Sequence, residues 1–419
     1  MKRKLISTVI ATLIVFSAFG QQFDLSAELR PRYENRHGFK TLLETNAKGS
    51  NFVSQRTRLN FGFKNEKLRL KIVMQNVRVW GDVGTLSSDD KASALHEAWA
   101  EAIVNTKTSF KLGRQEIVYD DHRIFGNVGW AQQARSHDAL LFKYTPNATN
   151  KLDIGLALNS DSQSNVDNLY SNAAGYKSLQ YAWYHGVFNK LGVSFLLLNT
   201  GIEYLDVNNE QTIDYMQTIG PRLTYKSGKF NANAAAYLQT GKSKDSKVKA
   251  SYFAGNIGYK FTKEWSLGLG VDQLSGTNSN ASSTDIKSFA PLFGTNHKFN
   301  GFMDYFYVGN HANSVGLRDL NMTLGYSKNK FSAKLIPHLF SAAADFFDGA
   351  TKMDARLGTE IDFTIGYKIA KDINLNAGFS KMFATETMEV LKGGDKDENN
   401  SWAWVMITFK PNLFSHRTN

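Results

Sequence analysis

The chain of 419 residues contains no cysteine and only six prolines. The absence of cysteine excludes disulfides, and it fits an exported protein that needs none. Long hydrophobic runs are also missing. Beyond the N-terminal segment, one of the strongest is Val193–Leu198, far below the roughly 20 residues of a membrane-spanning helix. An exported chain rich in aromatic residues and without such helices can still cross a membrane as a β-barrel.

The N-terminus has the pattern of a secretory signal. Basic residues 2–4 precede the apolar segment 5–19, and residues 18–20 supply the small side chains of a cleavage site. We therefore predict a signal peptide over residues 1–20 and a single mature domain over residues 21–419. A retained anchor is the alternative, but the apolar segment is short for a membrane span. Cleavage lowers the formal charge of +11 by three, and the remaining excess suits an anionic partner or anionic lipid.

Apolar and polar side chains alternate with a period of two along the mature chain. This pattern is expected of strands that face lipid on one side and water on the other. In the first segment the apolar positions are Phe23, Leu25, Ala27 and Leu29, and the opposite face carries Arg30 and Arg32. The same alternation recurs near residues 53–64, 68–75, 97–104, 152–159 and 360–368. Its repetition favours a barrel, although one such strand would also fit a soluble sandwich.

Short turns and longer links alternate between these segments. Short turns are expected near residues 65–66, 106–108, 146–150, 188–190, 227–228, 263, 329 and 370–372. Longer links are expected near residues 34–52, 80–94, 118–137, 160–176, 200–211, 241–246, 276–314, 341–357 and 385–400. The fold class is therefore all-β, a transmembrane antiparallel up-and-down barrel of about 18 strands with long outer loops. This count requires residues 299–308 to lie outside the wall.

Aromatic residues mark the strand ends and the closing strand. The segment Trp402–Phe409 is expected to close the barrel just before Pro411. Tyr144, Trp265, Tyr367 and Trp402 are either members of aromatic girdles at the membrane surfaces or simply residues that favour strands.

Two of the longer links are expected to fold into the barrel. The segment 118–137 is charged and long, and connections of this length are usually functional. The segment 276–314 places His297 and Lys298 close to several aromatic residues. We expect these two loops to constrict the lumen, with plugging and gating both left open.

The inward faces of the first strands carry many charges. The expected inward cations are Arg30, Arg32, Arg56, Arg58, Arg69 and Lys71. Arginine suits carboxylate recognition because its planar guanidinium pairs with both oxygens. Inward acidic residues such as Glu97 allow a second interpretation, in which the charges neutralise one another in a rigid polar lattice.

Catalytic and cofactor signatures are missing. Asp, His and Ser residues are present, but no spacing matches a metal site, a catalytic triad or a phosphate-binding loop. We therefore expect no enzyme activity and no cofactor. Nucleic-acid binding is not expected either, because the basic residues alternate along strands.

Several motifs resemble the alginate export family of outer-membrane barrels. They are RPRYE at residues 30–34, QRTRL at 55–59, LHEAWAE at 95–101, the long block at 113–140 and PLFGTNHKFNGFMDYF at 291–306. The resemblance implies an eighteen-stranded barrel with a positively charged, loop-constricted pore. On this basis we expect a constriction that includes Arg114, Arg123, Arg135, Asp138, His297 and Lys298 together with the inward cations and Glu97.

The expected function is passive passage of anionic solutes across the bacterial outer membrane, with an acidic oligo- or polysaccharide as the substrate. The expected partners are this solute, outer-membrane lipid and periplasmic export or uptake proteins. A general anion-preferring porin is one alternative, and a plugged barrel with a structural or surface role is another.

Overall fold

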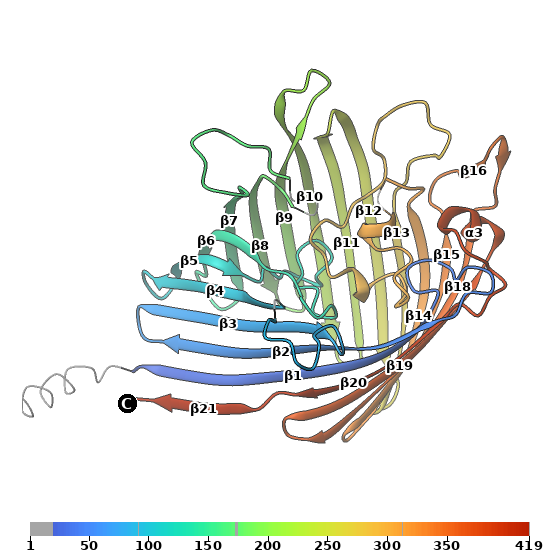
Figure 1. The fold of residues 1–419 in the computed structure, drawn as a ribbon. Helices are drawn as coiled ribbons and strands as arrows, with labels where there is room; N and C mark the ends of the chain where they lie inside the picture. Colours follow the sequence, from blue (N-terminus) through green and yellow to red (C-terminus); the bar gives the residue numbers. More distant parts are fainter. Residues whose placement is uncertain (1–19, 91, 172–174, 312, 419) are drawn as a thin grey trace, which may run out of the picture.

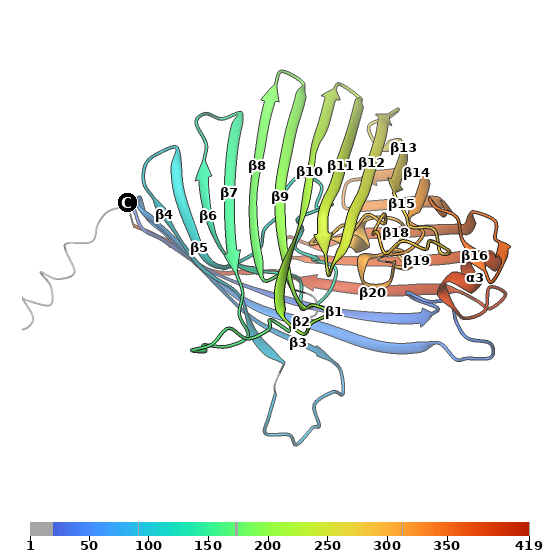
Figure 2. The same cartoon turned by 90° about the horizontal axis from the view of Figure 1, so that it is seen from above.

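The computed structural model describes residues 20–90, 92–171, 175–311 and 313–418, so the predicted signal peptide lies almost wholly outside the described residues. Eighteen antiparallel strands form a closed barrel, as predicted (Figure 1 and Figure 2). The wall strands are β1 (Gln22–His37), β2 (Ser50–Lys64), β3 (Leu68–Val79), β4 (Ser93–Ile103), β5 (Thr108–Gln115), β6 (His137–Tyr144), β7 (Asn150–Leu158), β8 (Ser178–Phe188), β9 (Leu191–Leu205), β10 (Gln211–Ser227), β11 (Phe230–Ser243), β12 (Ser246–Lys260), β13 (Trp265–Leu274), β14 (Leu317–Lys328), β15 (Phe331–Ser341), β18 (Arg356–Ala370), β19 (Ile373–Ala384) and β20 (Ser401–Phe409).

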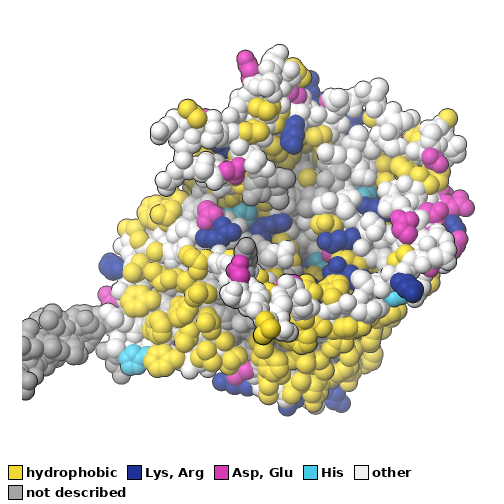
Figure 3. Space-filling view, viewed as in Figure 1, with side chains coloured by type: hydrophobic (Ala, Val, Ile, Leu, Met, Phe, Trp, Pro, Cys, Tyr) yellow, Lys and Arg dark blue, Asp and Glu magenta, His cyan; other side chains and the backbone are white. Residues whose placement is uncertain are grey.

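The alternating sequence explains how each strand is oriented. In β1, Phe23 and Leu29 are each 38% exposed, whereas Arg30 and Arg32 are buried. In a barrel the first pair faces the membrane and the second pair faces the lumen. The space-filling view shows a broad hydrophobic area over the outer wall, with Lys and Arg side chains at its lower margin (Figure 3).

The barrel closes where β1 pairs with both β2 and β20. After Pro411 the chain continues as β21 (Asn412–Arg417), which pairs with the first half of β1. The two segments therefore lie one after the other along β1, separated by an irregularity at Pro411. The main-chain N–H of Ala27 donates to the carbonyl oxygen of Pro411 at 3.1 Å across this break.

The strand connections follow the predicted alternation, with two corrections. The link between β9 and β10 is only residues 206–210, and that between β11 and β12 only residues 244–245, because these strands run further than predicted. Lys244 and Asp245 both have positive φ angles, of 50° and 67°. A two-residue hairpin turn of type I′ requires this conformation. The sequence Lys-Asp does not predict such a turn, because it lacks the Asn-Gly or Asp-Gly pair that is typical of it.

The remaining elements lie in the long loops. They are η1 (Asn296–Lys298), α2 (Val308–His311), α3 (Glu386–Lys392) and the hairpin of β16 (Phe347–Asp348) and β17 (Thr351–Lys352). Residues 299–307 contain no strand, and the segment 299–308 stays outside the wall, as the strand count required. None of the helices in the described part of the chain has the length and hydrophobicity needed to span a bilayer.

The aromatic residues near the strand ends fall into two groups. Tyr144, Trp265 and Tyr367 are exposed near the short turns, where the girdle interpretation places them. Trp402 is fully buried, and its Nε1 donates to Glu34 Oε2 at 3.1 Å. The girdle interpretation is therefore wrong for Trp402, which faces the lumen.

Candidate functional site: a shelf across the lumen

Two long loops fold into the barrel and pack against each other (Figure 2). The first inward loop, residues 116–136, joins β5 to β6, and the second inward loop, residues 275–316, joins β13 to β14. Phe125 of the first loop bridges to Phe293 of the second, and their rings stack with centroids 5.6 Å apart. Together the loops form a shelf across the lumen, and we use this name for the pair.

Glycine at two positions permits the close approach of the loops. A Cβ atom at Gly126 would collide with Thr295, and one at Gly294 would collide with the carbonyl group of Arg123. Without these side chains, the N–H of Gly126 donates to the carbonyl oxygen of Phe293 at 2.9 Å. The shelf is thus joined through its main chain as well as its aromatic rings.

The tip of the first inward loop, residues 129–133, is held against the wall by side chains of the first strands. Arg30 donates to the carbonyl oxygens of Gly129 at 2.8 Å and Trp130 at 3.1 Å. It also donates to Gln132 Oε1 at 2.8 and 3.1 Å. A guanidinium group carries five N–H donors in one plane, so it can bind several loop acceptors at once.

Neighbouring side chains reinforce this attachment. Arg32 donates to the carbonyl oxygen of Trp130 at 2.7 Å, and its guanidinium carbon lies 3.9 Å from the centroid of the Trp130 ring. Gln132 Nε2 donates to Ser54 Oγ at 3.0 Å. Arg30 and Arg32, which the sequence predicted to belong to the constriction, therefore help to anchor the loop tip, and Arg32 also forms an ion pair of 2.9 Å with Glu34.

Carboxylates neutralise other inward cations on the wall. The pairs are Arg56 with Glu28 at 2.5 Å, Arg69 with Glu101 at 3.2 Å, and Lys71 with Glu97. The second interpretation of the sequence, a neutralised polar lattice, describes these three pairs.

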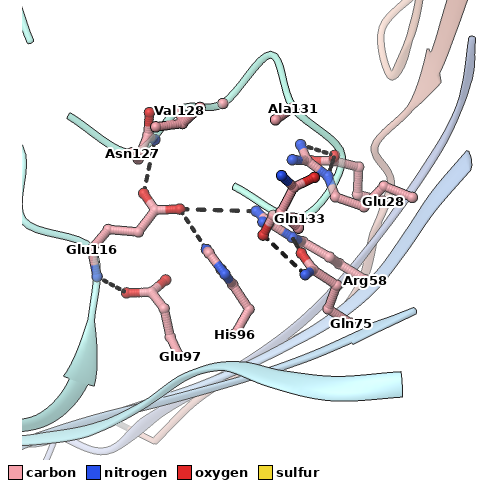
Figure 4. Close-up of polar contacts among 12 residues, drawn as sticks. Glu28, Arg58, Gln75, His96, Glu97, Glu116, Asn127, Val128, Ala131 and Gln133 are labelled. Atoms are coloured by element: carbon pink, nitrogen blue, oxygen red, sulfur yellow. Dashed lines mark hydrogen bonds and ion pairs between the residues drawn. The ribbon is translucent and has the colours of Figure 1, made fainter. Parts of the chain in front are cut away.

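Glu116, the first residue of the first inward loop, receives polar contacts from the wall and from its own loop (Figure 4). His96 Nε2 lies 2.8 Å from its carboxylate, Asn127 Nδ2 donates to it at 2.9 Å, and the guanidinium of Arg58 lies 3.9 Å away. Arg58 donates in turn to Gln75 Oε1 at 2.7 Å. Burial would raise the pKa of Glu116, but the hydrogen bonds from His96 and Asn127 outweigh it and lower the pKa to about 2.

Arg123 lies inside the shelf and not on its surface. It is 2% exposed, donates to Asn300 Oδ1 at 2.9 Å and approaches Asp272 Oδ1 at 3.3 Å. Its guanidinium carbon lies 4.6 Å from the ring centroid of Tyr252 and 4.4 Å from that of Phe299. Burial acts to lower the pKa of Arg123, but Tyr252 and Asp272 more than offset this effect. Arg123 therefore stabilises the shelf from within.

The rim between β5 and β6 carries three more of the expected residues. Arg114 and Asp138 form an ion pair of 2.7 Å and are exposed, and with Arg135 they border a cavity of about 630 Å³ on the long-loop side. Arg135 donates to the carbonyl oxygen of Gly294 at 3.1 Å and forms no ion pair with any described residue. Burial lowers the pKa of Arg135 to about 10, so the group stays charged at neutral pH.

His297 and Lys298 lie in η1 of the second inward loop. The ring of His297 stacks on Trp130 with centroids 4.5 Å apart. Lys298 Nζ donates to the carbonyl oxygen of Asp121 at 2.9 Å and, within the described residues, has no carboxylate partner.

Trp130 marks the boundary between two further cavities. On the long-loop side it lines a cavity of about 740 Å³ together with Arg36 and Lys40. On the short-turn side it lines a cavity of about 410 Å³ together with Lys298 and Lys334. We therefore place the constriction at the tip of the first inward loop, between these two cavities. In the space-filling view, Lys and Arg side chains lie around the central hollow (Figure 3).

Several residues of the shelf were not identified from the sequence. Glu116 and Gln132 are polar residues in a polar loop, and no spacing distinguishes them from their neighbours. Trp404 alternates with Trp402, which shows that they share a face, but two apolar side chains on one face indicate lipid as readily as a packed lumen. In the described part of the chain, no group of three or more His, Asp or Glu residues is placed to hold a metal ion.

Comparison with known proteins agrees with this architecture. A family model described as "Alginate export" matches residues 21–403. The chain belongs to the alginate export family. No curated protein sequence is significantly similar to this family member.

Solved structures show the same fold at low sequence identity. OccAB4 of Acinetobacter baumannii has a TM-score of 0.64 and 12% identity, over 95% of this chain and 99% of that chain. The outer membrane protein OpdK of Pseudomonas aeruginosa has a TM-score of 0.61 and 11% identity, over 94% and 99%. A BenF-like porin of Pseudomonas fluorescens Pf-5 has a TM-score of 0.61 and 14% identity, over 93% and 99%. This alginate export family member is an outer-membrane β-barrel channel.

Proposed function

We propose that this channel passes anionic solutes by diffusion and that acidic oligosaccharides are its preferred substrates. The observation that carries the proposal is the position of Arg135 and Lys298. One borders a cavity on the long-loop side of the shelf and the other a cavity on the short-turn side. Neither forms an ion pair within the described residues, so each retains positive charge to offer a solute.

Electrostatics support a preference for anions. Burial lowers the pKa of Lys298, Asp121 raises it, and the cations Arg222 and Lys334 lower it further. Lys298 and Lys334 line the same cavity, and that lining contains no aspartate or glutamate, so an entering anion meets a surface of positive charge. In a narrow lumen bounded by protein, such a surface raises the local concentration of counter-ions and their rate of entry.

The comparisons support the substrate class only by analogy. The family description names alginate, an acidic polysaccharide. The structure of OpdK, which shares the fold, has also been solved with vanillate, a small carboxylate. A general anion-preferring porin and a plugged barrel remain the competing functions, and each gives a different electrical result.

The test is the reversal potential of the refolded channel in a planar bilayer with unequal KCl on the two sides. We expect preference for chloride in the wild type and a clear shift toward potassium in the Arg135→Gln/Lys298→Gln double variant. Lys371→Gln, in a short turn, removes a charge away from the shelf and serves as the control. Cation preference in the wild type, or an unchanged double variant, would refute the proposal, and the absence of current would indicate a plugged barrel.

Block by an oligouronate then separates the two transport functions. Reversible block at concentrations where a neutral oligosaccharide of equal length has no effect supports acidic oligosaccharides as substrates. Chloride preference without block would leave only a general anion-preferring porin.

A further inference from the structure

The cavity of about 410 Å³ on the short-turn side has a regular floor. Two adjacent rows of paired, inward-facing residues cross β15, β18, β19 and β20. The first row is Lys334, Thr364, Gly378 and Trp404, and the second is Ser332, Gly366, Asn376 and Met406. The shelf covers this floor with Trp130, His297 and Phe302. The volume lies within the range of about 300–1,000 Å³ that is typical of small-molecule sites.

Two glycines hollow the floor and leave polar groups around it. A Cβ atom at Gly366 would lie 2.8 Å from Ser332 Oγ and 3.0 Å from Asn376 Nδ2. These two polar groups therefore approach each other across a position without a side chain. A Cβ atom at Gly378 would collide with the indole of Trp404, so the absence of a side chain there lets the Trp404 ring lie against the wall.

The charge of the cavity is of one sign. Its lining includes Lys298 and Lys334 but no aspartate or glutamate. Lys334 is exposed in the lumen, and its ammonium group forms no ion pair or hydrogen bond with any described residue. A lysine ammonium without a partner is a ready site for a carboxylate, because hydrogen bonds between charged groups are the stronger kind.

The aromatic side of the cavity suits a ring that is apolar on one face and polar at its edges. Trp130 and Trp404 pack edge to face with centroids 4.8 Å apart. Among the described residues none accepts a hydrogen bond from Trp404 Nε1, and this donor is not fully enclosed. A pyranose ring has apolar C–H groups on its faces and hydroxyl groups around its edge, so an indole face together with nearby hydroxyl and amide groups complements it.

We propose that this cavity is a binding subsite for one hexuronate ring of an acidic oligosaccharide, with the carboxylate on Lys298 and Lys334 and the sugar ring beside Trp404. Ser332, Thr364 and Asn376 supply hydrogen bonds to its hydroxyl groups. The inference rests on the proposed function and adds a defined place of retention on the short-turn side of the constriction.

The experiment measures how long trigalacturonate, added on the short-turn side, blocks single channels in a bilayer. Loss of a charge-assisted hydrogen bond in Lys334→Gln is expected to shorten the block about tenfold or more. Trp404→Phe keeps an aromatic ring but removes the Nε1 donor and part of the surface, so we expect a several-fold shortening. Lys330→Gln, in the turn at the start of the same strand, is the matched control, and Lys334→Arg should restore most of the block.

The outcomes separate this inference from the proposed function. Equal block times in Lys334→Gln and Lys330→Gln would overturn the subsite, as would equal block of the wild type by neutral maltotriose. Chloride preference without any block by trigalacturonate would also overturn it, while leaving anion passage intact. A wild-type channel that shows no chloride preference in sugar-free KCl would contradict the proposed function itself. Lys334 is exposed in the lumen, so its variants test the subsite even if Trp404→Phe folds poorly.

Discussion

Replacing Arg30 with alanine is expected to loosen the constriction without unfolding the barrel. Arg30 is 7% exposed, and its guanidinium binds the carbonyl oxygens of Gly129 and Trp130 and the side chain of Gln132. A hydrogen bond to a charged group contributes about 1.5–3 kcal/mol. These bonds share one planar group and are not additive, and water can reach part of the freed loop, so we expect a loss of about 2–4 kcal/mol in loop docking.

A loss of that size lowers the ratio of docked to undocked loop by about 30- to 1,000-fold. Single-channel recordings should therefore show larger current noise and brief steps of higher conductance in Arg30→Ala. Arg30→Lys keeps the charge but not the planar set of donors, so it should lie between the wild type and Arg30→Ala. Arg69→Ala removes an inward arginine that pairs with Glu101 away from the loop tip, and it should behave like the wild type.

A folded Arg30→Ala channel whose conductance and noise match those of the wild type would refute this role of Arg30. Folding is checked by circular dichroism and by the mobility shift of the folded barrel on electrophoresis. An equal increase in conductance and noise in Arg69→Ala would also refute it. The increase would then follow from the loss of any inward arginine and would not depend on the attachment of the loop tip.

Two further predictions concern residues that hold the inward loops in place. The folded pKa of Glu116, about 2, lies below its ordinary value of 4.5, so its stabilisation of the loop is present above pH 4.5 and is lost as the pH falls toward about 2. Channel noise should rise over this window, because the docked loop loses up to about 3 kcal/mol of stabilisation. The Glu116→Gln channel should be noisy at neutral pH, and its noise should respond less to acid. Gly301 has a φ of 84°, and a Cβ there would lie 2.6–2.7 Å from the buried carboxylate of Glu360. Gly301→Ala should therefore speed limited proteolysis of the second inward loop, whereas Gly81→Ala, with a φ of 93° and no such contact, should not.

The wall of the barrel could be predicted because its information is local. Alternation with a period of two identifies the lipid face of each strand, and the spacing of the turns gives the strand number. Errors arose where local signals are weak. The Lys244-Asp245 turn uses positive φ angles without glycine, and Trp402 has the apolar character of a lipid-facing residue although it is buried in the lumen.

The shelf could not be predicted in the same way because its contacts join distant segments. Arg30 and Gln132 are 102 residues apart, and Arg123 and Asn300 are 177 apart. Alternation shows that Arg30 faces the lumen, but it says nothing about what fills the lumen at that height. Arg30 was placed in the constriction because of its inward direction and the family resemblance of its motif, and neither reveals that its side chain binds the loop tip.

The inward cations therefore divide by chemistry as well as by position. Arg30 and Arg32 bind main-chain carbonyl oxygens of the loop tip, and the planar guanidinium suits such a task because it holds several donors in fixed directions. Lys298 and Lys334 line an open cavity with flexible ammonium groups, and neither forms an ion pair with a carboxylate of the described residues. A carboxylate that passes through the barrel can bind only to cationic groups that are not already paired with acceptors of the protein. In this channel, the arginines of the first strand consequently shape the constriction, while selectivity is expected to depend on the cations that face the cavities on either side of it.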